Sequence, residues 1–228
     1  IKLFNSDMTV NTTVAEDIGE TTFELKDLDF GTVYFWQVIV KDGITMPVNG
    51  DVWTFETEPF PDHRFLFTKE QNGKYDIYSA NIAFEGMKLT DNSGSNWRPL
   101  MSPDRNRVAY IGNIGIDAHL FVMNRDGSNV QQVTNTVPIS GFNNFELDYA
   151  WSPNGTQLLY MSLNKLYRIN LDGSGLTLVA QAPPNHTFSE CDWSLLNNQI
   201  LARVTGLNHY NSRIYVYDLN GNILDEIT

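Results

Sequence analysis

The fold is decided by the stretch Ala150-Trp151-Ser152-Pro153-Asn154, because two related stretches occur elsewhere in the chain. They are Leu100-Met101-Ser102-Pro103-Asp104 and Asp192-Trp193-Ser194-Leu195-Leu196, and the three serines are 50 and 42 residues apart. Eight residues beyond each serine, inside an apolar run, stand Tyr110, Tyr160 and Ala202. The chain after residue 62 is therefore an internal repeat, which has to be recognised before its strands are assigned.

A second set of landmarks follows in each repeat. The dipeptides Asp126-Gly127, Asp172-Gly173 and Asn220-Gly221 each lie between two apolar runs. Such dipeptides predict tight β-hairpins, because both central residues of the turn favour a positive φ. Several short strands in every repeat predict the blades of a β-propeller, and a blade buries its faces only against its neighbours.

These residues resemble the WD40-like repeat, often called PD40, of TolB-type propellers, with its Trp-Ser-Pro-Asp-Gly core and glycine hairpin. The resemblance covers residues 64–228, with residues 150–160 the nearest match, while Met101 and Leu195 depart from the pattern. It implies a TolB-like β-propeller with about four visible blades. The innermost strand occurs three times and the other strand types four times, so we expect these blades to be part of a larger ring.

The first residues have a different β pattern. Apolar and aromatic alternation predicts strands around residues 21–28, 34–40 and 52–55. The segments 28–38, 41–43 and 53–57 resemble the second half of a fibronectin type III domain, a β-sandwich. The resemblance implies a tyrosine corner, in which Tyr34 bonds back to the backbone near Leu28. We interpret residues 1–58 as the C-terminal part of such a domain, acting as a spacer.

Two prolines, Pro59 and Pro61, indicate a short stiff linker at residues 59–63. Charge also changes there: residues 1–62 hold 12 acidic and 3 basic residues, and residues 63–228 hold 15 and 12. The whole chain has a net charge of -12, which disfavours a nucleic-acid partner. No apolar run is long enough to cross a bilayer. The single cysteine, Cys191, excludes an internal disulfide and a cysteine-based zinc site.

No catalytic residue, cofactor site or metal site is predicted. The segments 124–128 and 170–174 lack the alternating carboxylates of a calcium loop, so we interpret them as turns. The four histidines have no ligand spacing. Ser102 and Ser152 recur with the repeat, so we expect their hydroxyl groups to stabilise a turn in each blade.

The loops between blades are the expected ligand face, since binding residues concentrate on loops. Aromatic side chains on these loops suit a protein or glycan partner. The candidate binding residues are Phe142, Phe145, His186, Phe188, His209 and Tyr210.

The leading hypothesis is a non-enzymatic interaction protein of a bacterium, placed outside the cytoplasm by the resemblance: periplasmic, secreted or on the cell surface. The propeller face would bind a protein partner or a cell-surface polysaccharide, and the protein would be a component of a larger envelope assembly. The first alternative is the propeller portion of a larger secreted hydrolase or peptidase, whose catalytic domain lies outside these residues. The second is a propeller with its own lyase or lactonase site. A contiguous apolar patch would favour a protein partner, and exposed rings and amides would favour a glycan.

Overall fold

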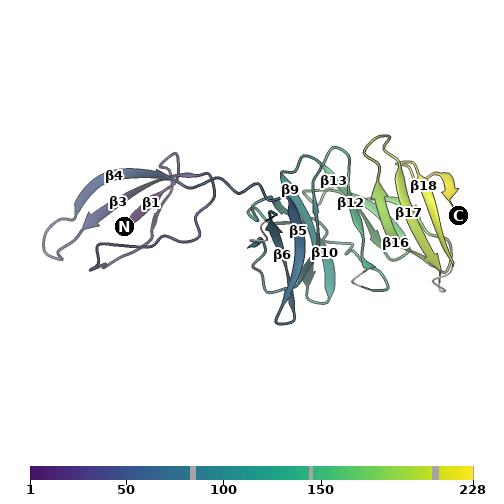
Figure 1. The fold of residues 1–228 in the computed structure, drawn as a ribbon, viewed down its shortest axis with the longest axis horizontal. Coiled ribbons are helices and arrows are strands. Elements are labelled where there is room, and N and C mark those ends of the chain that lie inside the picture. Colours follow the sequence, from purple (N-terminus) through teal and green to yellow (C-terminus); the bar gives the residue numbers. More distant parts are fainter. Residues whose placement is uncertain (83–85, 144–145, 207–210, 228) are drawn as a thin grey trace. The chain divides into compact units, whose positions relative to one another are not determined.

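The computed structural model describes residues 1–82, 86–143, 146–206 and 211–227. These residues form strands, turns and irregular connections, and no α-helix occurs among them. The chain divides into two compact units, Ile1–Asp62 and His63–Thr228. The all-β fold class predicted from the sequence is confirmed (Figure 1).

The unit Ile1–Asp62 is one antiparallel sheet with the strand order β2-β1-β3-β4. Its strands are β1 (Lys2–Phe4), β2 (Asn11–Thr13), β3 (Val33–Val40) and β4 (Val48–Glu56). Tyr34 on β3 lies opposite Phe55 on β4, and their stacked rings have a centroid distance of 5.6 Å. The two strands predicted around residues 34–40 and 52–55 are therefore present.

The strand predicted around residues 21–28 is not formed. These residues follow an irregular path, and Asp27 has a left-handed φ of 57°. A strand requires a neighbour that satisfies its backbone donors and acceptors. Residues 21–28 do not pair with either edge strand of the sheet. The apolar alternation alone was therefore not sufficient to form a strand.

The hydrogen bond predicted for Tyr34 is present. The backbone N–H of Asp29 donates to Tyr34 Oη over 3.0 Å, so the ring ties the irregular segment to β3. Tyr34 is buried, whereas most side chains around it in this unit are partly or fully exposed. The assignment of the unit to the fibronectin type III family stays a prediction.

The unit His63–Thr228 contains four antiparallel sheets that follow one another along the chain (Figure 1). The first sheet contains β5 (Phe65–Gln71), β6 (Lys74–Ala80) and β7 (Gly86–Lys88). The second contains β8 (Asn96–Met101), β9 (Arg107–Ile114), β10 (Asp117–Asn124) and β11 (Gln131–Gln132). We call these sheets blades 1 and 2.

Blades 3 and 4 repeat the four-stranded pattern. Blade 3 contains β12 (Tyr149–Trp151), β13 (Gln157–Ser162), β14 (Lys165–Asn170) and β15 (Thr177–Gln181). Blade 4 contains β16 (His186–Trp193), β17 (Ile200–Gly206), β18 (Ser212–Tyr217) and β19 (Ile223–Ile227). Among the described residues the innermost strand type therefore occurs three times, as β8, β12 and β16, and the other three types four times each, as predicted.

The blades are held together by apolar side chains from facing sheets. One buried cluster joins blades 2 and 3 and includes Ile111, Leu120 and Tyr160. A second cluster joins blades 3 and 4 and includes Leu159, Phe188 and Ala202. Each cluster draws on two successive sheets, which is why a single blade cannot bury its own apolar residues.

The repeated aromatic residues face one another across the second and third strands of a blade. Stacked pairs with centroid distances of 5.7, 5.3 and 5.7 Å are Phe67–Tyr78, Tyr110–Phe121 and Tyr160–Tyr167. In blade 4 the corresponding pair in the strand register is Ala202 and Tyr215, and Tyr215 packs beside Tyr217 instead. The repeat in the sequence thus marks one cross-strand contact in each blade.

The hairpin glycines are required by a contact between blades as well as by the turn. Gly127 has φ 90°, and a methyl group added there would lie 2.6 Å from the carbonyl oxygen of Leu89 in the preceding blade. Gly173 has φ 82°, and a methyl group there would lie 3.0 Å from the carbonyl oxygen of Val133. Any larger residue would separate the two blades or distort the turn.

Candidate functional site

A cavity of about 620 Å³ lies beside the innermost strand of blade 4. Its walls come from the connection between blades 2 and 3, from β16 and from the neighbouring strands β17 and β18, with Arg98 added from β8. The charged side chains of the lining are Arg98, Glu146, Asp148, Glu190, Asp192 and Arg203. A concave site of this size, built by several elements, is typical of a ligand-binding site.

Asp148 organises the inner end of the cavity. Arg98 Nη2 donates to Asp148 Oδ1 over 2.6 Å, and the backbone N–H of Cys191 donates to Asp148 Oδ2 over 2.9 Å. Because Arg98 belongs to β8, Asp148 immediately precedes β12 and Cys191 belongs to β16, one carboxylate connects the inner strands of three blades. Both carboxylate oxygens are occupied, so Asp148 has a structural role in the wall.

Arg98 is held in an uncommon backbone conformation that directs it to this position. Its φ is 52°, and it lies where the register of β8 shifts between Trp97 and Leu100. A bulge of this kind re-aims a side chain out of the regular alternation. The bulge places the Arg98 guanidinium group next to Asp148, which forms an ion pair with it.

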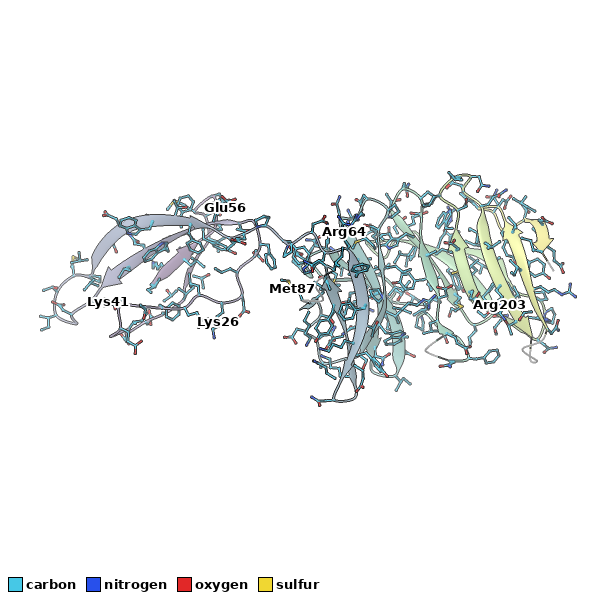
Figure 2. The ribbon with its side chains drawn as sticks, viewed as in Figure 1. Lys26, Lys41, Glu56, Arg64, Met87 and Arg203 are labelled. Atoms are coloured by element: carbon cyan, nitrogen blue, oxygen red, sulfur yellow. The ribbon has the colours of Figure 1, made fainter. Side chains whose placement is uncertain are left out.

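A second ion pair lies on β16 and β17. Arg203 Nη1 is 3.1 Å from Glu190 Oε1, and the two residues face each other in the strand register (Figure 2 labels Arg203). The Glu190 side chain is 61% exposed, compared with 11% for that of Asp148. The Arg203–Glu190 pair is therefore accessible to solvent and can exchange partners at little cost.

The rest of the lining combines hydroxyl groups with apolar side chains. Ser189 Oγ lies 2.9 Å from Thr205 Oγ1, which lies 3.3 Å from Ser212 Oγ. Apolar surface comes from Met161, Phe188, Cys191, Leu201 and Ile214. Burial raises the pKa of the Cys191 thiol well above its usual value, so this group stays protonated and is a poor nucleophile.

The structure places three of the six candidate binding residues. Phe142 lines the cavity and is 69% exposed, whereas Phe188 lines it as a buried ring that packs edge-on against Tyr217. His186 starts β16; its Nδ1 lies 2.9 Å from the carbonyl oxygen of Pro184, and the residue is not part of the cavity lining. Phe145, His209 and Tyr210 lie outside the described residues.

The charged residues of the cavity were not singled out from the sequence, although the repeat contains a signal for them. Arg98, Asp148 and Glu190 each stand four residues before the serine of the repeat motif, at Ser102, Ser152 and Ser194. This position is charged in all three stretches, and all three residues line the cavity. Extending the alignment of the motif to four residues before the serine would have identified this charged position.

The repeated serines have the turn role expected of them. Ser152 Oγ accepts a hydrogen bond from the backbone N–H of Gln157 over 2.9 Å and donates to Asn154 Oδ1 over 2.8 Å. Ser102 makes the same contacts with Arg107 and Asp104. Both hydroxyl groups are therefore committed to the turn between the first two strands of a blade.

The Asx-rich hairpins also close on themselves. Ser128 Oγ donates to Asp126 Oδ1 over 2.7 Å, and Ser174 Oγ donates to Asp172 Oδ1 over 2.6 Å. The backbone N–H groups of Ser128 and Ser174 donate to the same two oxygens over 2.9 Å, which are the bonds of Asx turns. In the part of the chain that the structure describes, no group of three or more His, Cys, Asp or Glu side chains is arranged to hold a metal ion.

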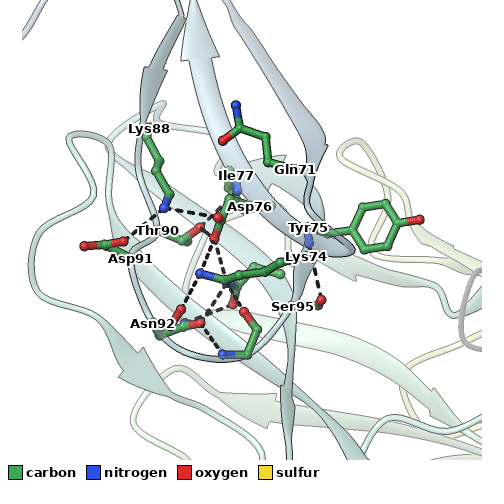
Figure 3. A network of polar contacts seen from close by, with 12 residues as sticks. Gln71, Lys74, Tyr75, Asp76, Ile77, Lys88, Thr90, Asp91, Asn92 and Ser95 are labelled. Atoms are coloured by element: carbon green, nitrogen blue, oxygen red, sulfur yellow. Dashed lines mark hydrogen bonds and ion pairs between the residues drawn. The ribbon is translucent and has the colours of Figure 1, made fainter.

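A second polar cluster surrounds Asp76 in blade 1 (Figure 3). Its carboxylate lies 3.3 Å from Lys74 Nζ and 3.1 Å from Lys88 Nζ, and accepts hydrogen bonds from Thr90 and Asn96. Burial by itself raises the pKa of Asp76, but the hydrogen bonds from Lys88, Lys74 and Thr90 outweigh it, so the pKa lies below the ordinary 3.8. The cluster connects blade 1 to β8, and its carboxylate is fully used within the fold.

The fold and the cavity together define this part of the chain as a β-propeller with a polar site beside its inner strands. No known protein-family profile matches the sequence, and no curated protein matches it. Solved structures do match. A TolB protein of Agrobacterium tumefaciens is similar with a TM-score of 0.57 and 18% identity, over 71% of this chain and 61% of that one.

Two further solved structures share the architecture. TolB from Acinetobacter baumannii has a TM-score of 0.57 and 16% identity, over 86% of this chain and 49% of that one. A quinonprotein alcohol dehydrogenase-like protein of Bacteroides thetaiotaomicron has a TM-score of 0.51 and 12% identity, over 76% and 43%. The chain thus spans less than two thirds of the length of these proteins, and the likeness shows a TolB-like propeller fold.

Proposed function

We propose that this chain is a non-enzymatic interaction protein whose propeller face binds a partner outside the cytoplasm. The observation that carries the proposal is the cavity of about 620 Å³ at the inner strands, with the exposed ring of Phe142 on its lining. The extracytoplasmic placement rests on the resemblance to TolB-type propellers. The unit Ile1–Asp62 acts as a spacer that presents the propeller.

The loops near the cavity favour a protein partner over a polysaccharide. Residues 139–140 form bridges to β10 and β13, at Ala118 and Ser162, so this connection lies between two hairpins. Those hairpins carry Ile116 and Leu163, which are 94% and 48% exposed, and the connection itself carries Phe142. Exposed apolar side chains on adjoining loops are typical of a surface that associates with another protein. A polysaccharide is the second candidate ligand of the same face.

The experiment is photo-crosslinking in the organism that produces the protein. A p-benzoylphenylalanine is placed at position 142, and a control at position 225, which is exposed on β19 and does not line the cavity. The expected result is an adduct of defined mass from position 142 alone, identified as a protein by mass spectrometry. Retention of the purified protein on an envelope polysaccharide, without a protein adduct, would favour the second candidate.

Cell fractionation tests the placement. The intact natural protein is expected in the periplasm, on the surface or in the medium. A protein confined to the cytoplasm, with neither a protein adduct nor polysaccharide retention, would contradict the proposed function.

A further inference from the structure

The charges that line the cavity are unbalanced. It contains four carboxylates, from Glu146, Asp148, Glu190 and Asp192, and two guanidinium groups, from Arg98 and Arg203. Each guanidinium group is already paired, Arg98 with Asp148 at 2.6 Å and Arg203 with Glu190 at 3.1 Å. The lining as a whole therefore has an excess of negative charge, which favours a cationic ligand.

The remaining two carboxylates come from two different elements of the lining. Glu146 belongs to the connection between blades 2 and 3, and Asp192 belongs to β16. Both residues are exposed. One oxygen of Asp192 accepts the backbone N–H of Trp193 over 2.8 Å, which fixes the orientation of the carboxylate and leaves its second oxygen for a ligand.

Apolar surface lies next to these charges. Leu201 is paired with Asp192 across β16 and β17, and it lines the cavity together with Ile214 and Met161. Leu201 is 41% exposed. The side chains of Arg and Lys combine an apolar stem with a charged end, so a wall of this composition can contact both parts of such a side chain.

Phe142 adds an aromatic ring to the same lining. It is 69% exposed, although it is part of the cavity wall. A ring in this position can interact with a cation through its face, and the interaction is stronger for the planar guanidinium group of Arg.

Together these features point to one ligand class. We propose that the cavity binds an arginine- or lysine-bearing segment of a protein partner, with the stem on Leu201 and Ile214 and the charged group between Glu146 and Asp192. This inference rests on the proposed protein-binding function and names the chemistry of its partner. The net charge of -12 on the whole chain also favours the approach of a basic segment. An anionic polysaccharide is the least compatible ligand.

The test measures binding of hexa-arginine to the full chain by isothermal titration calorimetry, at low and moderate salt. We expect the double variant Glu146→Gln, Asp192→Asn to bind about tenfold more weakly than the unmodified chain. The matched control is Glu20→Gln, Asp225→Asn, which removes the same charges at exposed positions outside the cavity. The affinity of this control for hexa-arginine is expected to stay within about twofold of that of the unmodified chain, because distant exposed charges are screened.

A second pair of variants tests the aromatic contact. Phe142→Ala is expected to weaken hexa-arginine binding, whereas Phe65→Ala, which removes a 54% exposed ring from β5, is expected to leave it unchanged. Far-UV circular dichroism and the thermal midpoint establish that each variant is folded. Competition with spermidine distinguishes a peptide segment from a free polyamine as the ligand. Binding of hexaglutamate, measured in the same way, tests whether the cavity prefers a positively or a negatively charged ligand.

Three results would overturn the inference: equal weakening by both double variants, spermidine binding as tightly as the peptide, or preferred binding of hexaglutamate. If hexa-arginine fails to bind while the adduct at position 142 persists in the producing organism, the protein-binding function stands and only the charge class is wrong. If both fail, the proposed function fails as well.

Discussion

Gly127 shows at the residue scale why the repeat keeps its hairpin glycines. Its φ of 90° excludes most side chains, and an added methyl group would also lie 2.6 Å from Leu89 O and 3.2 Å from Leu89 Cα. The position therefore has two separate requirements, one from the turn and one from the neighbouring blade. These requirements can be measured separately.

Gly127→Ala is expected to lower the free energy of unfolding by about 2–4 kcal/mol, from backbone strain and from the clash between blades. The matched control is Gly115→Ala, because Gly115 has φ 63° with open space around it. The control is expected to cost about 1–2 kcal/mol, from the left-handed backbone alone. Urea denaturation gives both values, and an equal loss would show that the contact with Leu89 is unimportant.

Asp76 and Asp91 provide a second residue-scale comparison, because both carboxylates contact Lys88, at 3.1 and 3.0 Å. The Asp76 side chain is 5% exposed and that of Asp91 is 94% exposed. Asp76→Asn is expected to destabilise the protein at pH 7 by about 1–3 kcal/mol, because two lysines lose a buried partner. Asp91→Asn is expected to change stability by at most about 0.5 kcal/mol.

The effect of Asp76 also depends on pH. Its pKa in the folded protein is lowered, so its contribution is complete above the unfolded pKa of about 3.9 and is lost as the pH falls through the folded pKa. The stability difference between the unmodified chain and Asp76→Asn should therefore shrink below about pH 4. Denaturation curves measured at several pH values check this, and a difference that grew on acidification would contradict the assignment.

Asp148 acts at the scale of the elements, since it connects β8, β12 and β16. Asp148→Ala is expected to cost about 3–5 kcal/mol, because Arg98 and the Cys191 N–H both lose their acceptor. Asp148→Asn keeps one side-chain oxygen as an acceptor, so it should lower the free energy of unfolding by less than Asp148→Ala. Glu190→Ala, at the exposed pair with Arg203, is the control and should cost less than about 1 kcal/mol.

Thermal unfolding followed by circular dichroism ranks the three variants. Hydrogen exchange adds a local measurement, because loss of Asp148 should expose the Cys191 amide. If Asp148→Ala and Glu190→Ala had the same effect, the three-blade connection would have no energetic importance.

The elements of the propeller could be predicted from the sequence more fully than its site. Ser152, Gly127 and Tyr160 have counterparts in other blades that make the same contact, such as Ser102, Gly173 and Tyr110, and such repeated contacts leave a periodic signal. Arg98 and Asp148 share a repeated charged position, four residues before the motif serine. Their pairing across 50 residues depends in addition on a bulge at Arg98, and the bulge is not visible in the repeat pattern. The strand expected at residues 21–28 failed for a related reason: its formation depends on a partner strand elsewhere.

At the scale of the whole molecule, the two units are expected to unfold independently. Among the described apolar residues of Ile1–Asp62 only Tyr34 is buried, whereas the second unit contains two extended buried clusters. The first unit should therefore unfold at the lower temperature, because less apolar surface is removed from water. Differential scanning calorimetry should show two transitions.

Two tyrosine variants assign the transitions. Tyr34→Phe removes the acceptor of the Asp29 N–H and should lower only the first transition, whereas Tyr160→Phe removes the bond to Val137 O and should lower only the second. Each should cost about 1–2 kcal/mol. A single transition that both variants shift would contradict the division into two independent units.

Three contacts between blades that end on backbone carbonyls share one direction along the chain. The Tyr149 hydroxyl lies 2.6 Å from Arg98 O, Trp151 Nε1 donates to Leu100 O, and the N–H of Phe188 donates to Leu163 O. In each contact the donor belongs to the later blade and the acceptor is a backbone carbonyl of the earlier one. During synthesis the earlier blade leaves the ribosome first. In these three contacts the acceptor is thus synthesised before its donor, so the propeller can be assembled in the order in which it is translated.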